Sequence, residues 1–159
     1  MIFASNGATL HICTTEQNSD YPPDKSAYEN LNYIVVSEVE SIGPFGKTWT
    51  VSEFPSLEAR RILRAKGAVD AGSIEIVAAF DYSDAGQLAI LEALSAEDGD
   101  YAFKIVFADA PSGGTPSVRY FLAIVTSANE VLDAADNIQR LRITLWINSE
   151  IVRVAAAGP

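Results

Sequence analysis

The sequence predicts a mainly β domain of the α+β class: a β-sandwich or barrel with one packed α-helix, plus a long loop that contains a short helix. Several segments alternate apolar and polar residues with a period of two, which is typical of half-buried strands. Residues 84–95 combine an N-terminal cap with apolar residues at helical spacing. The length of 159 residues suits one domain, which buries roughly 70% of its unfolded surface. We expect a single domain over residues 1–159, divided into an N-terminal segment and loop (1–32), a long assembly loop with a short helix (41–67) and the core strands and helix (73–154).

The N-terminal part is predicted to hold one short strand followed by a surface loop. Residues 9–13 alternate apolar and polar side chains, as in a strand with one buried face. Residues 14–30 are polar and contain Pro22 and Pro23, which remove two backbone donors and favour extended backbone. A surface loop is therefore expected over this stretch.

The next segment is predicted to change from a strand into a long connection. Residues 33–40 are rich in β-branched residues and alternate toward their end, so this strand is expected to become half-exposed. Residues 41–55 combine turn chemistry with three aromatic side chains, Phe45, Trp49 and Phe54. Aromatic residues on a long connection are normally buried by the body of the domain or by another chain.

A short helix is predicted for residues 56–66. Ser56 is a suitable N-cap, and Gly67 is a suitable residue to end the helix. This segment carries four of the eleven cations of an acidic chain, which is a favourable docking feature but is equally typical of a solvated helix face. The four cations are Arg60, Arg61, Arg64 and Lys66.

The core is predicted to begin with a strand and the main helix. Residues 73–80 place their larger apolar side chains on one face. The helix over residues 84–95 begins with a capping-box pattern, in which Asp84 is followed three residues later by Gln87. Its leucines recur at helical spacing, so one face is expected to pack on the sheet.

Three further strands complete the predicted core, at residues 101–107, 118–126 and 138–147. The connection over residues 109–116 is rich in glycine and proline and is expected to form a hairpin loop. Residues 130–136 are acidic and are expected to form a loop or a single helical turn. The last strand carries arginines on one face and aliphatic residues on the other.

Charge and composition argue against several classes of protein. The formal net charge of −10 argues against tight binding to a phosphate backbone, which needs clustered lysine and arginine. No segment has the basic and apolar pattern of a signal peptide or the apolar length of a membrane span, so we expect no membrane insertion. The single cysteine, Cys13, precludes an intramolecular disulfide.

The candidate catalytic and metal sites are incomplete. His11 and Cys13 could face one metal ion on a strand, but the chain has no other histidine or cysteine to complete a zinc site. The carboxylates near residues 81–84 and 98–100 lie where helix caps and turns favour short acidic side chains. The lone histidine has no motif around a possible nucleophile. We therefore expect no enzymatic activity, no cofactor and no metal.

The order of parts in the second half resembles the lambda-type major tail tube proteins of long-tailed bacteriophages, the siphoviruses. In that family a strand ends in an acidic loop, a Gly-Gln pair opens the single helix, and an aromatic-rich strand with a lysine follows. Residues 80–84, Gly86-Gln87 and residues 101–107 with Lys104 match this order. The resemblance covers about half of the chain. We expect no counterpart after Val154 of the immunoglobulin-like domain that some relatives carry.

The resemblance implies a structural protein of the virion that assembles in the host cytoplasm. Its subunits are expected to form hexameric rings that stack in a helical assembly, the hollow tail tube through which DNA passes during ejection. The implied partners are other copies of the chain, the tape measure protein and the tail terminator. DNA is expected to pass without specific binding.

Two sets of side chains are predicted to serve this assembly. The aromatic residues Phe45, Trp49 and Phe54, together with the basic residues Arg60, Arg61, Arg64 and Lys66, are expected to form the ring interface, since they supply apolar anchors and complementary charge. Carboxylates on strand faces are expected to line the lumen, where they would repel DNA. The candidates are Glu38, Glu40 and Glu75.

Two alternatives stay open from the sequence. A tube protein of a contractile injection device or type VI secretion system shares the expected fold. A small β-sandwich ligand-binding module, such as a lectin, would instead be a monomer with an aromatic-lined pocket.

Overall fold

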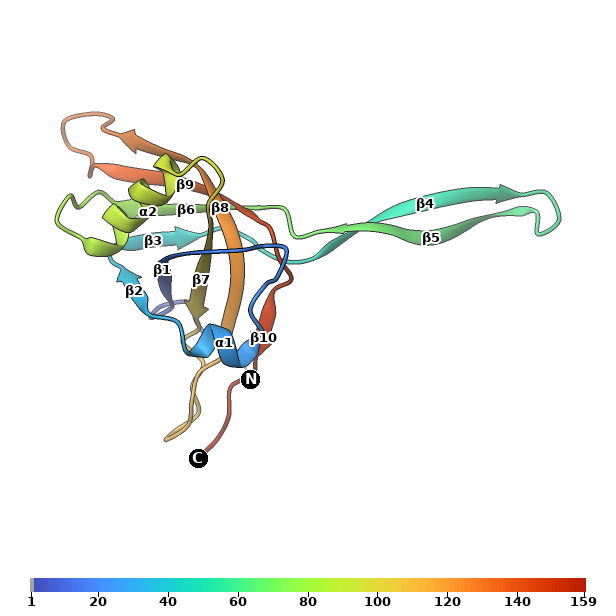
Figure 1. The fold of residues 1–159 in the computed structure, drawn as a ribbon, viewed down its shortest axis with the longest axis horizontal. Coiled ribbons are helices and arrows are strands. Elements are labelled where there is room, and N and C mark those ends of the chain that lie inside the picture. The colour runs from blue at the N-terminus through green and yellow to red at the C-terminus, as the bar shows by residue number, and fades with distance from the viewer. Residues whose placement is uncertain (1) are drawn as a thin grey trace.

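The structure, a computed structural model, describes residues 2–159 and confirms the mainly β class. Figure 1 shows a body of curved strands with the helices beside it, and a long two-stranded arm that projects from the body. The strands are β1 (Thr9–Gln17), β2 (Tyr33–Val36), β3 (Val39–Ile42), β4 (Thr48–Ser56), β5 (Arg61–Asp70), β6 (Ser73–Ala79), β7 (Asp100–Val106), β8 (Val118–Val131), β9 (Arg140–Ile147) and β10 (Val152–Val154). The helices are α1 (Lys25–Glu29) and α2 (Ala85–Ser95).

The body is one antiparallel sheet whose two edge strands are consecutive in the chain. The strand order is β2-β1-β7-β8-β9-β6-β3, and β10 pairs with the first residues of β8. Since every neighbouring pair is antiparallel, β2 and β3 run in the same direction at opposite edges. The chain from β2 to β3 therefore joins the two edges, and the sheet forms an incompletely closed barrel.

The prediction of one strand over residues 33–40 is wrong, because the structure has two strands there, β2 and β3. Glu38, between the two strands, has a φ of 57°, a left-handed conformation that interrupts regular strand geometry. The interruption lets the first half pair with β1 and the second half with β6.

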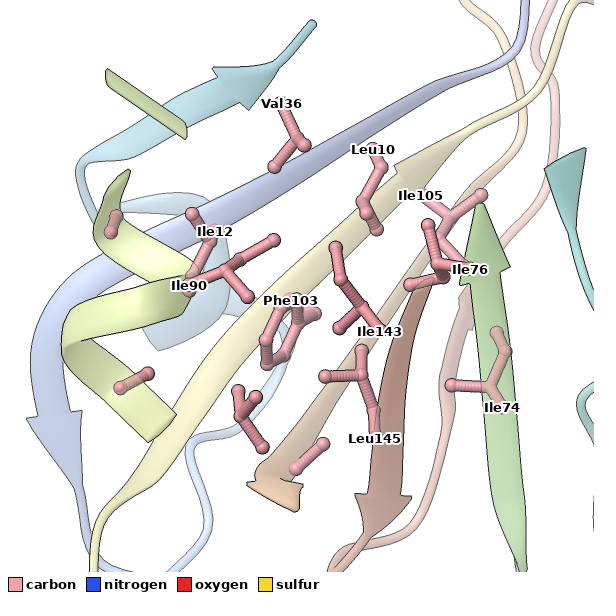
Figure 2. Packing of buried hydrophobic residues seen from close by; sticks show 14 of the residues in the cluster. Leu10, Ile12, Val36, Ile74, Ile76, Ile90, Phe103, Ile105, Ile143 and Leu145 are labelled. Atoms are coloured by element: carbon pink, nitrogen blue, oxygen red, sulfur yellow. The ribbon is translucent and has the colours of Figure 1, made fainter. Parts of the chain in front are cut away.

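The inward side chains of the strands and α2 share one core. Figure 2 shows Leu10, Ile12 and Phe103 from one part of the sheet packed toward Ile143 and Leu145 from another. The rings of Phe103 and Phe121 stack, with their centroids 5.8 Å apart. The period-two alternation predicted for the core strands is therefore confirmed, since their apolar faces point into this core.

Helix α2 packs against β8, β2 and β1. The predicted cap is confirmed: the Asp84 carboxylate accepts the backbone N–H of Gln87 at 2.8 Å, and it also accepts that of Ser37 at 3.2 Å. The Gln87 side chain is 1% exposed; its amide donates to the carbonyls of Ser37 and Ala79 and accepts the N–H of Asp81. A side chain on Gly86 would overlap the backbone of β2. The Gly-Gln pair thus joins the helix to edge strand β2, to the end of β6 and to the break before β3.

The N-terminal loop prediction over residues 14–30 is partly wrong. Strand β1 continues to Gln17, and α1 begins after Asp24, whose carboxylate caps Ala27 at 2.8 Å. Tyr28 is fully buried against the outer face of the sheet and stacks on Tyr120. A helix of five residues depends on this packing, because its own hydrogen bonds are too few to stabilise it.

The predicted long loop and short helix over residues 41–67 are wrong. This stretch continues into the β4–β5 hairpin, whose strands pair only with each other and which we call the arm (residues 48–70). The residues that suggested a helix cap and a helix end, Ser56 and Gly67, instead stabilise the hairpin. The Ser56 hydroxyl accepts the N–H of Ala59 at the tip, and Gly67 lies at a register shift where a Cβ would be 2.6 Å from the Thr50 hydroxyl. Cap and turn chemistry look alike in sequence.

The last strands differ from prediction mainly in length. Strand β8 extends to Val131, past the predicted end at residue 126, with a register shift between Val125 and Ser127. The acidic loop is correspondingly shorter, and β9 begins at Arg140. The short strand β10 was not predicted.

Candidate assembly surface

The arm exposes large apolar side chains that its own body does not cover. It extends away from the barrel in Figure 1. Leu57 at the tip is 96% exposed, Phe54 is 66% exposed and Trp49 is 40% exposed. Val51, Ile62, Leu63 and Val69 are also exposed. A two-stranded ribbon is marginally stable alone in water, and contiguous exposed apolar surface marks an interaction site.

The arm presents different chemistry on its two faces. Phe54 lies opposite Leu63 in the register, so these side chains form an apolar pair on one face. Trp49 is five residues from Phe54 and therefore points to the other face. There the ammonium groups of Lys47 and Lys66 lie 5.6 and 5.4 Å from its ring centroid. Both faces of the arm are thus suited to being covered.

The arm carries positive charge on an acidic protein. Residues 47–70 hold five of the eleven cations but only three of the 21 carboxylates. Arg60 lies at the tip with a φ of 53°, Arg61 begins β5, and Arg64 pairs with Glu53 at 2.7 Å. All four basic residues of the predicted interface therefore lie on the arm, on a hairpin rather than a helix.

The root of the arm is attached to the body by Phe45 and Lys47. Phe45 is half-buried against the core, and its ring meets that of Phe107 edge-on at 6.4 Å. Lys47 forms an ion pair with Glu150 at 3.0 Å. The structure thus separates Phe45, which anchors the root, from Trp49 and Phe54, which project along the arm.

The candidate lumen carboxylates lie on or beside the edge of the sheet. Glu75 points outward from β6 opposite Thr144, and Glu38 is exposed at the break before β3. Glu40 forms an ion pair with Arg140 at 2.6 Å, and this hydrogen bond lowers the pKa of Glu40. The outward face of β9 also carries Arg142, so these carboxylates share their surroundings with arginines.

The sequence did not indicate a groove of about 790 Å³ beside β3. Residues 3–8 form one wall, and β3 forms the other. Ile42, Phe45 and Phe107 contribute apolar side chains to its lining. In residues 2–159, no strand pairs with the second edge of β3, so its backbone faces this groove unpaired.

The described residues offer no metal site or membrane-spanning helix. No group of three or more histidine, cysteine, aspartate or glutamate side chains in residues 2–159 is arranged to hold a metal ion. Neither helix of that part of the chain is long and apolar enough to cross a membrane.

Three solved structures share this architecture. A chain of the anti-feeding prophage baseplate superposes with a TM-score of 0.67 at 14% identity, covering 98% of this chain and 97% of that one. A chain of the SPP1 tail tube superposes with a TM-score of 0.62 at 15% identity, covering 93% of this chain and 76% of that one. The chain has the tail tube fold. A chain from the sheath/tube terminator of PVC, an extracellular contractile injection system, superposes with a TM-score of 0.69 at 10% identity, covering 98% of both chains.

The fold is what these structures and this chain share. No protein-family model matches the sequence, and no curated protein matches it. In this tail tube fold, the curved body holds the core, and the arm carries a contiguous set of the exposed apolar side chains. Val51, Leu57, Ile62, Leu63 and Val69 were missed as candidate interface residues. The alternation of Trp49 and Val51 with the polar residues Thr48, Thr50 and Ser52 is a strand signal that could have indicated β4 and, with it, Val51.

Proposed function

We propose that the chain is a tube subunit that forms hexameric rings, and that the rings stack into the hollow tail tube of a long-tailed bacteriophage. The observation that carries the proposal is the arm, whose apolar side chains stay exposed in the monomer although the body is well packed. The shared fold supports the same conclusion. Copies joined head to tail generate rings and helical stacks, in which an arm on one copy is covered by another.

The chemistry of the arm suits contact between copies of an acidic chain. Trp49 and Phe54 point to opposite faces, so an arm between neighbouring subunits buries both. Arg60, Arg61, Arg64 and Lys66 add positive charge, which is attracted to the acidic bodies of neighbours. We place the ring interface on these residues, with Phe45 holding the root of the arm in position.

A tube in a virion also implies how the chain meets DNA, which partners it has and where it assembles. DNA passes through the lumen during ejection, and outward carboxylates such as Glu75 and Glu38 weaken its binding by like charge. Glu40 contributes less, because Arg140 neutralises it. The partners are other copies of the chain, the tape measure protein and the tail terminator, and assembly takes place in the host cytoplasm.

A contractile injection device is the second candidate, favoured by the likeness to the anti-feeding prophage and PVC chains. Neighbouring genes distinguish the two. A tape measure gene with tail assembly chaperones supports the phage tail, and sheath genes support the contractile device. A ligand-binding module is the third candidate, and it requires a monomer that keeps its arm exposed.

The proposal is tested by negative-stain electron microscopy of the concentrated protein. We expect rings and tubes from the unaltered chain. The double variant Trp49→Ala/Phe54→Ala is expected to stay folded but monomeric, because truncating anchors of this kind costs about 2 kcal/mol or more each at an interface. The matched control is Tyr21→Ala/Tyr82→Ala, which removes two exposed aromatic rings outside the arm and should leave the tubes intact. Tubes of normal length from the Trp49/Phe54 variant would contradict the placement of the interface, and a monomer at every concentration would contradict the function.

A further inference from the structure

We propose that the groove between residues 3–8 and β3 receives the tip of the arm of a second copy of this chain. The inference rests on the proposed tube function and deepens it, because it names the surface that the arm occupies. The tip comprises the end of β4, the turn over residues 57–60 and the start of β5.

The apolar surfaces of the tip and the groove are complementary. Leu57 and Phe54 project from the tip without cover in their own chain, and the exposed Leu63 lies opposite Phe54 on β5. In the groove, Ile42 and Phe45 are half-buried side chains in contact with the core. Covering both sets at once removes apolar surface from water on each partner.

The charges are complementary as well. Glu40 and Asp109 are the charged residues of the groove lining, within the part of the chain that the structure describes. Asp109 accepts the N–H of Ser117 at 2.7 Å, and the hydrogen bonds from Ser117 lower the pKa of Asp109, so its carboxylate is ionised at neutral pH. Arg60 and Arg61 stand at the tip of the arm. Because Arg140 already pairs with Glu40, Asp109 is the groove carboxylate that is available to attract the basic tip.

The backbones supply a third match. The second edge of β3 is unpaired along the groove, and each strand of the arm also has an unpaired outer edge, as far as residues 2–159 are concerned. Unpaired strand edges are templates for pairing with another chain. The arm cannot reach its own groove, because it extends away from the body (Figure 1).

Disulfide cross-linking tests this placement in the full chain. Leu57→Cys puts a thiol at the tip, and Ser41→Cys puts one on the exposed surface of β3 with little change in volume. The native Cys13 is buried and is left in place, with Leu57→Cys alone as its control. The matched control pairs Leu57→Cys with Ser83→Cys, an exposed site beside the acidic residues Asp81 and Asp84. Electron microscopy of each sample records whether tubes form.

We expect the Ser41/Leu57 variant to give a ladder of dimers, trimers and larger species on a non-reducing gel after assembly and oxidation. Mixing the two single variants is expected to stop the ladder at the dimer, since each chain then carries one introduced thiol. The Ser83 control is expected to stay monomeric on the gel although its tubes form.

The outcomes separate this inference from the proposed function. Tubes in which Leu57→Cys links to Ser83→Cys instead of Ser41→Cys would overturn the groove and leave the tube function standing. Tubes in which Ser41→Cys links to a thiol introduced at the exposed Ile2 would overturn it in favour of the N-terminal segment as the occupant. An unaltered chain that forms neither rings nor tubes would overturn both proposals.

Discussion

At the residue scale, His11 connects protonation to stability. Its ring lies on β1 with Nε2 2.9 Å from the Thr9 hydroxyl, opposite Lys104 in the register. Burial, and secondarily the positive charge of Lys104, lower the pKa of His11 to about 4. The folded protein therefore resists a proton that the unfolded chain accepts near its ordinary pKa of 6.5. The contribution of His11 to stability is complete above about pH 6.5 and is lost as the pH falls toward 4.

This predicts a specific acid sensitivity. The His11→Gln variant should lose less of its free energy of unfolding than the unaltered chain between pH 7 and pH 4.5, because glutamine does not titrate. Urea unfolding of both proteins at several pH values measures the difference, and carboxylates shared by the two proteins cancel in the comparison. If the free energy of unfolding of the two proteins changed in parallel with pH, His11 would not be the source of the acid sensitivity.

Other single residues confirm that local chemistry can be read from the sequence while its purpose cannot. The Asp84 cap was predicted and is present. The Ser56 and Gly67 signals were read as a helix cap and a helix end, and they instead form the tip and the register shift of a hairpin. Each signal extends over only a few residues, so it does not report which distant strand its neighbours pair with.

At the element scale, Gln87 ties α2 to the end of β6 and to the break between β2 and β3. The edges β2 and β3 do not complete the sheet with each other, and Gln87 bonds to backbone groups near both. The carbonyl of Ala79 belongs to β6, and that of Ser37 lies in the break between the edges. One buried side chain therefore joins a helix, a strand end and a loop.

We expect Gln87→Leu to lower the free energy of unfolding by about 2–4 kcal/mol, because it leaves three partly buried backbone groups without partners at about 1 kcal/mol or more each. Gln139→Leu is the matched control, since this glutamine is exposed and should change stability by less than about 0.5 kcal/mol. Denaturant unfolding followed by circular dichroism measures both. Equal stability of the two variants would indicate that α2 does not depend on Gln87.

At the scale of the whole molecule, charge is distributed unequally between the arm and the body. The arm and its root hold five cations against three carboxylates, and the rest of the chain holds eighteen carboxylates against six cations. Identical copies that repel through their bodies can still attract through an arm of opposite sign, and salt weakens this attraction by screening.

Charge reversal on the arm tests this distribution. Arg60→Glu/Arg61→Glu should raise the protein concentration needed for assembly, most strongly at low salt. Lys25→Glu/Arg153→Glu makes the same change in net charge outside the arm, and should have a smaller effect. Sedimentation of assembled protein at increasing salt measures both variants. An equal loss of assembly in the two would indicate general repulsion rather than a role for the arm.

The sequence by itself determined the mainly β class, the alternating core strands and the capped helix α2, because hydrophobic period and capping are local properties. It also indicated Trp49, Phe54 and the basic cluster as unusual, although their interface role stays a prediction. Only the tertiary structure decided that residues 48–70 form a projecting hairpin, that β2 and β3 lie at opposite edges of one sheet, and that a groove opens beside β3. These features depend on which segments pair across long stretches of chain, and that choice is made by the burial of the whole core rather than by any short run of residues.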